Sequence, residues 1–142
     1  MILLDTDHLT VLEFPEGPVF GHLTARMATV DHREFAASVV SAEEQMRGWL
    51  DQISRARTIH DQVRYYAKLA KLFRSFARWS LVEFDSRAAR QFEDLRRHKI
   101  RIGTMDLKIA AIALANDALL LSANLRDYNK VPGLRVEDWL RA

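Results

Sequence analysis

The sequence predicts an α/β fold: a short parallel sheet flanked by helices on both faces, with a helical hairpin in the middle of the chain. Short apolar runs bounded by turn residues, typical of buried strands, alternate with longer segments in which apolar residues recur every three or four positions, typical of helices. The chain of 142 residues is long enough to enclose one core, and its hydrophobic fraction of 49% is ordinary for a globular protein. We therefore expect a single domain over residues 1–142.

The first part of the chain predicts two strands with two helices between them. Residues 1–4 form a short apolar run, and Thr6 is expected to N-cap a brief helix over residues 6–13. A proline opens the next helical segment, residues 18–30. Proline is favourable in the first turn of a helix, because a backbone N–H at that position would have no partner within the helix. Residues 34–40 are the second predicted strand.

The middle of the chain predicts a helical hairpin over residues 42–53 and 58–79. In the second of these helices apolar side chains recur along one side. The residues on this side are Ile59, Val63, Tyr66, Ala67, Ala70, Phe73 and Ala77. The aromatic residues of the hairpin are expected to fill a core or a dimer contact rather than to stack on bases.

The last part of the chain predicts two more strands, over residues 81–84 and 118–122, followed by a short edge element near the end. Between the two strands, Asp85 or Ser86 is expected to cap one helix, and a second helix should cover residues 105–116. Four apolar strands separated by helices imply a parallel sheet, because a parallel connection needs a long crossover.

The charge of the chain is segregated, although the formal net charge is only +2. Residues 1–46 carry two basic and eight acidic side chains, residues 47–101 carry fourteen basic and six acidic ones, and residues 102–142 carry five of each. An acidic start beside a basic middle suits a cation pocket next to a phosphate-binding surface, but basic residues also solvate the outer faces of long helices. The sequence has no cysteine, which excludes disulfides and thiolate metal sites.

Three carboxylates lie where an α/β fold gathers functional side chains. Asp5 ends the first apolar run, Glu44 lies early in the hairpin, and Asp106 opens a later helix. The carboxyl ends of parallel strands share one edge of the sheet, so we expect these acids to meet there. Carboxylates hold hard divalent cations, which activate water and stabilise charge during phosphodiester hydrolysis. The pattern therefore indicates a metal-dependent site that cuts phosphodiesters.

Each acid also has a purely structural interpretation. Glu44 stands three residues after Ser41, the spacing of a capping box, and in that case Glu43 could serve the site instead. A carboxylate at Asp106 is favoured by the helix dipole alone, and Asp5 could be an N-cap.

Four segments of the chain resemble the PIN-domain ribonucleases, specifically the VapC-type toxins of bacterial toxin–antitoxin pairs. These segments are residues 1–9, 41–48, 102–111 and 121–139. The resemblance implies an endoribonuclease that depends on Mg²⁺ or Mn²⁺ and cuts RNA such as tRNA, rRNA or mRNA. It also implies a cognate antitoxin as partner and a homodimer.

The resemblance further implies roles for particular side chains. The family's three main acids, which would be both catalytic residues and metal ligands, fall on Asp5, Glu44 and Asp106. Its fourth acid falls on Asn124, which offers a carbonyl oxygen but no charge, so Asp127 is a further candidate, and Asp7 is expected in an outer role.

Basic side chains of the hairpin are candidates for binding RNA phosphates or an acidic antitoxin segment. We expect Arg64, Lys68, Lys71 and Arg74 to serve as RNA-binding residues. The sequence has no basic leader before an apolar stretch and no run of about 18 apolar residues. These absences predict a cytoplasmic protein without a membrane segment.

Two other functions stay open. Asp5 and Asp7 after an apolar strand also match the Asp-x-Asp pair of haloacid-dehalogenase-type phosphatases, although Leu9 stands where that class has Thr or Val. Alternatively, Asn124 is compatible with a catalytically impaired PIN fold that only binds RNA or an antitoxin. The five histidines lack the i, i+4 pairing of zinc hydrolases, which disfavours that class.

Overall fold

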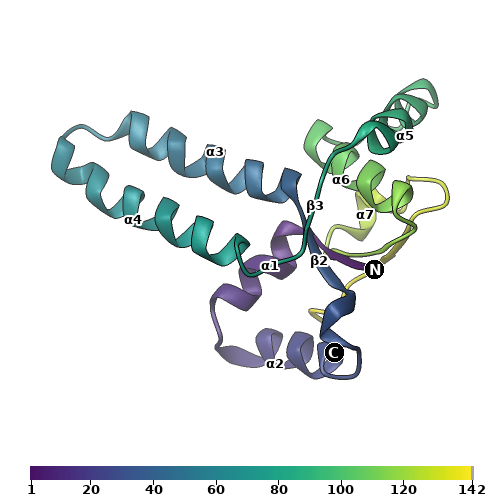
Figure 1. The fold of residues 1–142 in the computed structure, drawn as a ribbon, viewed down its shortest axis with the longest axis horizontal. Coiled ribbons are helices and arrows are strands. Elements are labelled where there is room, and N and C mark those ends of the chain that lie inside the picture. The colour runs from purple at the N-terminus through teal and green to yellow at the C-terminus, as the bar shows by residue number, and fades with distance from the viewer. Residues whose placement is uncertain (142) are drawn as a thin grey trace.

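A computed structural model describes residues 1–141 and contains a sheet of five parallel strands (Figure 1). The strands are β1 (Ile2–Leu4), β2 (Phe35–Ser38), β3 (Leu81–Val82), β4 (Leu119–Leu121) and β5 (Arg135–Glu137), in the spatial order β3-β2-β1-β4-β5. In the register of the central strand, Leu3 lies opposite Ala36 on one side and Leu120 on the other. The predicted fold class is confirmed, and the predicted edge element supplies the fifth strand.

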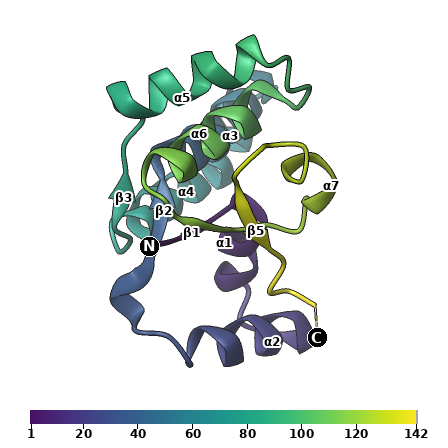
Figure 2. The ribbon, with the colours of Figure 1, turned by 90° about the vertical axis from the view of Figure 1, so that its right-hand side faces the viewer.

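Within residues 1–141, seven helices and one 3₁₀ turn connect the strands. They are α1 (Thr6–Glu13), α2 (Gly17–Met27), η1 (His32–Glu34), α3 (Val39–Arg55), α4 (Ile59–Phe76), α5 (Ser86–Arg97), α6 (Thr104–Ala115) and α7 (Leu125–Tyr128). Figure 2 shows α5 and α6 on one side of the sheet and α1 and α2 on the other.

The apolar strands are continuous because both faces of the sheet are buried. Leu3 and Leu120 join a core formed with α5 and α6, whereas Leu4 and Leu121 point to the opposite face and join a second core with residues of α1 and α2. Trp139 closes this second core. Two separate cores hold the carboxyl ends of β1 and β4 in place from both sides.

Two helix starts differ from the prediction. Asp5, not Thr6, caps α1 by accepting the Thr6 N–H at 2.8 Å. Ser38 caps α3 by accepting the Ser41 N–H at 3.0 Å, so Val39 and Val40 are helical and the strand predicted over residues 34–40 ends earlier. The cap overrides the strand preference of these two valines.

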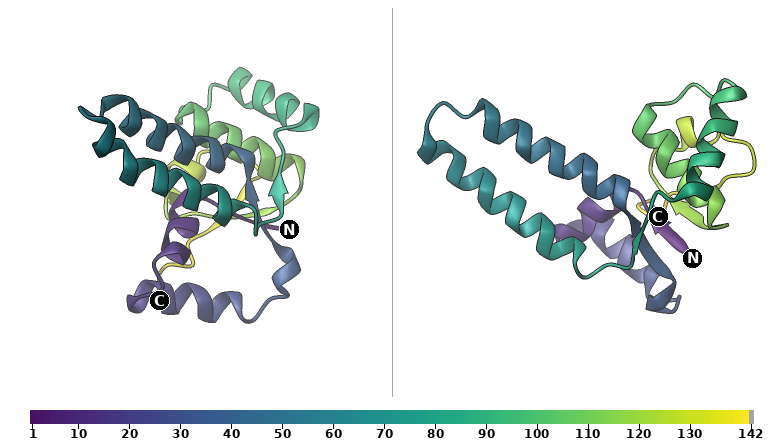
Figure 3. Two further views of the ribbon diagram at one scale, coloured as in Figure 1. Left: turned by 60° about the vertical axis from the view of Figure 1, so that its left-hand side comes forward. Right: turned by 45° about the horizontal axis from the view of Figure 1, so that its top comes forward.

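The predicted hairpin is present as α3 and α4, which project beyond the sheet (Figures 1 and 3). On the predicted apolar side of α4, Ile59, Val63, Tyr66 and Phe73 are 54–72% exposed, so they fill no core within residues 1–141, and the dimer contact stays a prediction. The side chains of α4 that turn inward include Leu72 and Tyr65, whose ring lies 6.5 Å from that of Trp49 on α3. No helix within residues 1–141 combines the length and apolar character needed to cross a bilayer.

Candidate active site

Asp5 stands at the centre of an acidic cluster at the carboxyl edge of the sheet. The residue follows β1 directly, and its buried carboxylate accepts a hydrogen bond from the Ser122 hydroxyl at 2.8 Å. Ser122 follows β4, the neighbour of β1, so the pairing of the two strands places both side chains at the same edge. With the Thr6 N–H on its other oxygen, Asp5 is held in one orientation.

Glu44 reaches the same place from α3. Its Oε1 lies 3.5 Å from the Thr6 hydroxyl, which is next to Asp5 in the chain. The capping-box interpretation is wrong, because α3 begins at Val39 and Ser41 is already inside the helix. Glu43 instead forms an ion pair with Arg47 at 2.5 Å.

Asp106 approaches from the opposite side of the cluster, in the first turn of α6. One of its oxygens accepts a hydrogen bond from the Tyr128 hydroxyl at 3.3 Å, and the other lies 3.5 Å from the Asn124 amide nitrogen. Asn124 in turn donates its backbone N–H to Ser122. A chain of contacts through Ser122 and Asn124 therefore joins Asp106 to Asp5.

Burial raises the pKa values of all three acids, and the charges of neighbouring carboxylates add to the shifts. Burial, followed by the charges of Asp7 and Asp106, raises the pKa of Asp5 to about 6. Burial also raises the pKa of Glu44, and the charges of Asp5 and Asp106 add to it. Burial raises the pKa of Asp106 as well, although the hydrogen bond from Tyr128 partly opposes the shift.

No lysine or arginine among residues 1–141 forms an ion pair with Asp5, Glu44 or Asp106. Buried carboxylates that repel one another and lack a cationic partner suit a hard divalent cation, whose preferred ligands are oxygens. As the side chains stand, no three His, Asp or Glu residues of the described chain are close enough together to enclose a metal ion. Glu44 and Asp106 are held only by hydrogen bonds of 3.3–3.5 Å, beyond the usual 2.7–3.2 Å, which leaves them free to turn toward a cation.

The three secondary candidates lie around this cluster. The Asn124 amide nitrogen lies 3.1 Å from Asp127 as well as 3.5 Å from Asp106, so its nitrogen faces both acids. Hydrogen bonding from Asn124, and then the nearby Lys130, lower the pKa of Asp127. Burial alone would raise the pKa of Asp7, but hydrogen bonds from His8 and the Ala123 N–H lower it, so Asp7 is a fixed anion beside Ser122.

The sequence analysis missed two side chains that organise the cluster, Tyr128 and His8. Tyr128 is fully buried and its hydroxyl contacts Asp106. His8 is also fully buried; its Nε2 accepts the Trp139 N–H at 3.1 Å, so Nδ1 carries the proton and donates to Asp7 at 2.6 Å. The only signal in the sequence for the role of His8 was its position in the first turn of a helix that starts at the sheet edge.

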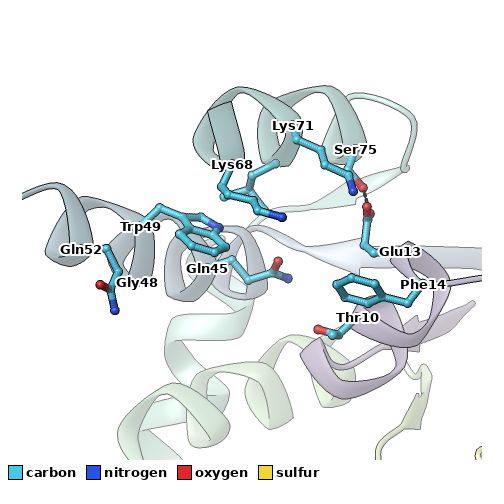
Figure 4. Close-up of a pocket in the computed structure, with 11 residues that line it drawn as sticks. Thr10, Glu13, Phe14, Gln45, Gly48, Trp49, Gln52, Lys68, Lys71 and Ser75 are labelled. Carbon is cyan, nitrogen blue, oxygen red and sulfur yellow. Dashed lines mark hydrogen bonds between the residues drawn. The ribbon is translucent and has the colours of Figure 1, made fainter. Parts of the chain in front are cut away.

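The predicted RNA-binding residues separate into two groups. Lys68 and Lys71 line a cavity of about 400 Å³ between α1, α3 and α4 (Figure 4). Arg64 stacks over the ring of its neighbour Tyr65, with 4.8 Å between the guanidinium carbon and the ring centroid, and Arg74 is exposed. Neither arginine lines the cavity.

Part of the chain is similar in sequence to proteins named as VapC ribonucleases. It is 31% identical over 67 residues to the tRNA(fMet)-specific endonuclease VapC of Salmonella typhimurium, an alignment that covers 44% of this chain and 51% of that protein. It is 42% identical over 48 residues to ribonuclease VapC1 of Rickettsia felis, covering 34% and 36% of the two chains. The chain therefore matches about half or less of the length of these relatives. No protein-family profile matches it.

The fold is shared over the full length. VapBC-1 from nontypeable Haemophilus influenzae superimposes with a TM-score of 0.75 at 18% identity, covering 99% of this chain and 100% of the other. VapBC2 from Rickettsia felis, solved with a promoter DNA fragment, gives a TM-score of 0.68 at 21% identity. This alignment covers 98% of this chain and 99% of the other. These comparisons confirm the predicted fold and the predicted resemblance to VapC-type PIN domains.

Proposed function

We propose that this chain is a divalent-metal-dependent endoribonuclease, the toxin of a toxin–antitoxin pair that acts in the cytoplasm. The observation that carries the proposal is the gathering of Asp5, Glu44 and Asp106 at one sheet edge, without cationic partners, in a fold shared with VapBC proteins. The curated relatives are named as ribonucleases, which supports RNA as the substrate.

In this proposal the three acids would hold the Mg²⁺ or Mn²⁺ ion, which when bound supplies a Lewis acid for the phosphoryl group and activates water for attack. The remaining side chains position these ligands. Thr6 and Ser122 hold Asp5, and Tyr128 and Asn124 hold Asp106. The anion at Asp7 keeps Ser122 and the Ala123 backbone in place, which is an outer role rather than that of a second phosphatase aspartate.

Tyr128→Phe is expected to weaken cation binding about 10-fold while leaving the fold intact. The hydroxyl is lost but the buried ring remains, and removing an outer partner of a metal ligand typically costs about 10–100-fold in affinity or activity. Titration calorimetry with Mn²⁺ measures the affinity, and Tyr66→Phe, on the exposed side of α4, serves as the control. Equal affinity of Tyr128→Phe and the wild type would remove Tyr128 from the site.

The decisive experiment for the function is incubation of the purified protein with tRNA and with ribosomal RNA, in Mg²⁺, in Mn²⁺ and in EDTA. We expect discrete fragments with either cation and none in EDTA. Phosphate release from small monoesters instead would support the phosphatase. RNA that is retained but never cut, with either cation, would support the impaired binding module.

We also propose two protein partners. Solved structures that share this fold include toxin–antitoxin complexes, which supports a cognate antitoxin as one partner. The second proposed partner is another copy of the chain. The support is the exposed apolar side of α4, where four large apolar side chains form a stripe rather than a single exposed residue: Ile59, Val63, Tyr66 and Phe73.

A further inference from the structure

The cavity between α1, α3 and α4 continues the acidic cluster along two helices. Thr6 and Glu44 contact each other at the cluster; four residues further along their helices, Thr10 and Gly48 line the cavity. Residues four apart lie on the same helix face, one turn or about 5.4 Å along the axis. The cavity therefore begins about one helical turn from the acids, on the same side of both helices.

The walls of the cavity are aromatic. Figure 4 shows Trp49 on one side and Phe14 on the other, with the Gln45 amide between them. Trp49 is partly buried and is backed by Tyr65, whereas Phe14 is 61% exposed. A side-chain carbon built on Gly48 would meet no atom within 4 Å, so the passage from Glu44 along α3 is open.

The cations of the cavity have no acidic partner within residues 1–141. Neither Lys68 nor Lys71 forms an ion pair within residues 1–141, and the Lys71 ammonium lies 5.9 Å from the centroid of the Phe14 ring. The one acid of the lining, Glu13, is already engaged by the Ser75 hydroxyl. Each kind of group in the cavity suits one part of a nucleotide. Aromatic rings stack on the base, side-chain amides form hydrogen bonds with the edge of the base, and ammonium groups pair with the phosphate.

We propose that this cavity binds one nucleotide of a single-stranded RNA segment next to the phosphate that is cut, with the base against Trp49 and the phosphate at Lys68 and Lys71. The inference rests on the proposed function and names the substrate contact that the acids alone do not supply. An apolar peptide anchor is the competing occupant, but it would make no use of the two ammonium groups and the amide, whereas an anionic nucleotide would pair with them. The free lysines and the continuity with the acids favour the nucleotide.

The test uses the intrinsic fluorescence of tryptophan and a variant expected to cut RNA at least about 100-fold more slowly, Asp5→Asn. Of the three tryptophans only Trp49 lines the cavity, while Trp79 and Trp139 belong to the second core. In EDTA, which removes the cation needed for cutting in the proposed function, we expect a five-nucleotide single-stranded RNA to quench the fluorescence of Asp5→Asn and not that of the double variant with Trp49→Phe. Trp49→Ala should weaken RNA binding about 5- to 150-fold, the usual effect of losing one stacked base.

Salt dependence tests the lysines. Each of Lys68→Gln and Lys71→Gln should reduce the slope of log affinity against log salt by about 0.7, the value for one phosphate contact on a single strand. Arg90→Gln, the same charge change on exposed α5 across the sheet, should leave the slope unchanged. Unchanged thermal melting of each variant excludes unfolding as the cause.

The two proposals fail in different ways. Quenching that persists in the Trp49→Phe variant, or RNA affinity unchanged by Trp49→Ala, overturns the nucleotide site even if the wild type cuts RNA. If only a partner peptide quenches Trp49, the cavity belongs to a protein contact and the inference is wrong. RNA that quenches Trp49 but is never cut with any cation supports the nucleotide site and contradicts the nuclease.

Discussion

Replacing Asp5 by asparagine is expected to lower RNA cleavage by at least about 100-fold, because loss of a metal ligand should cost no less than loss of its outer partners. Asparagine has nearly the same size and is an equally good N-cap, so α1 should remain in place. The measurement is the single-turnover cleavage rate at saturating Mg²⁺. Cleavage within a few-fold of wild type would remove Asp5 from the chemistry.

The same substitution is expected to stabilise the cation-free protein at pH 7. The pKa of Asp5 is raised from 3.8 to about 6, so the folded state favours the protonated carboxyl. This contribution to stability is fully present below pH 3.8 and is lost as the pH rises through about 6. A shift of this size corresponds to at most about 3 kcal/mol at pH 7, which asparagine would recover.

Urea unfolding in EDTA at pH 4 and pH 7 tests how the stability difference between Asp5→Asn and wild type changes with pH. The advantage of Asp5→Asn over wild type should be small at pH 4 and large at pH 7, and added Mg²⁺ should stabilise only the wild type. Asp117→Asn is the control, since that side chain is 98% exposed and precedes β4 at the opposite end of the strand. An advantage independent of pH would show that the buried charge is not its cause.

The parallel sheet, and the edge of the sheet at which the acids lie, could be predicted because topology fixes them. A parallel sheet made of strand–helix units puts every strand's carboxyl end at one edge, so Asp5 and Ser122, 117 residues apart in the chain, come to lie 2.8 Å apart. The pattern of apolar residues was sufficient to predict that these side chains share one edge of the sheet. No knowledge of side-chain orientation was needed.

Side-chain partners could not be predicted in this way. The apolar stripe of α4 has a helical period, yet the period alone does not say whether a core or solvent lies beside it, and Ile59 is 72% exposed. The contact between Tyr128 and Asp106 depends on how the single-turn helix α7 packs after β4, which local preference does not determine. Because Ser38 caps α3, the two valines that follow it are helical, although valine by itself prefers strands.

Glu44→Gln is expected to reduce cleavage by at least about 100-fold, whereas Glu43→Gln on the same helix should change it by no more than a few-fold. The two glutamates are neighbours of the same length and charge, so helix propensity and net charge change identically in the two variants. What differs is direction: Glu43 pairs with Arg47 near the surface, and Glu44 lies beside Thr6. Burial and the charges of Asp5 and Asp106 raise the pKa of Glu44.

The pair therefore measures the position of one side chain and not the loss of a carboxylate in general. Because the folded state favours the protonated form of Glu44, its glutamine variant should also be the more stable of the two in EDTA. Glu43→Gln gives up an exposed ion pair, which contributes at most about 1 kcal/mol. Equal loss of cleavage in both variants would contradict the orientation of α3, because only one of two adjacent helical residues can face the cluster.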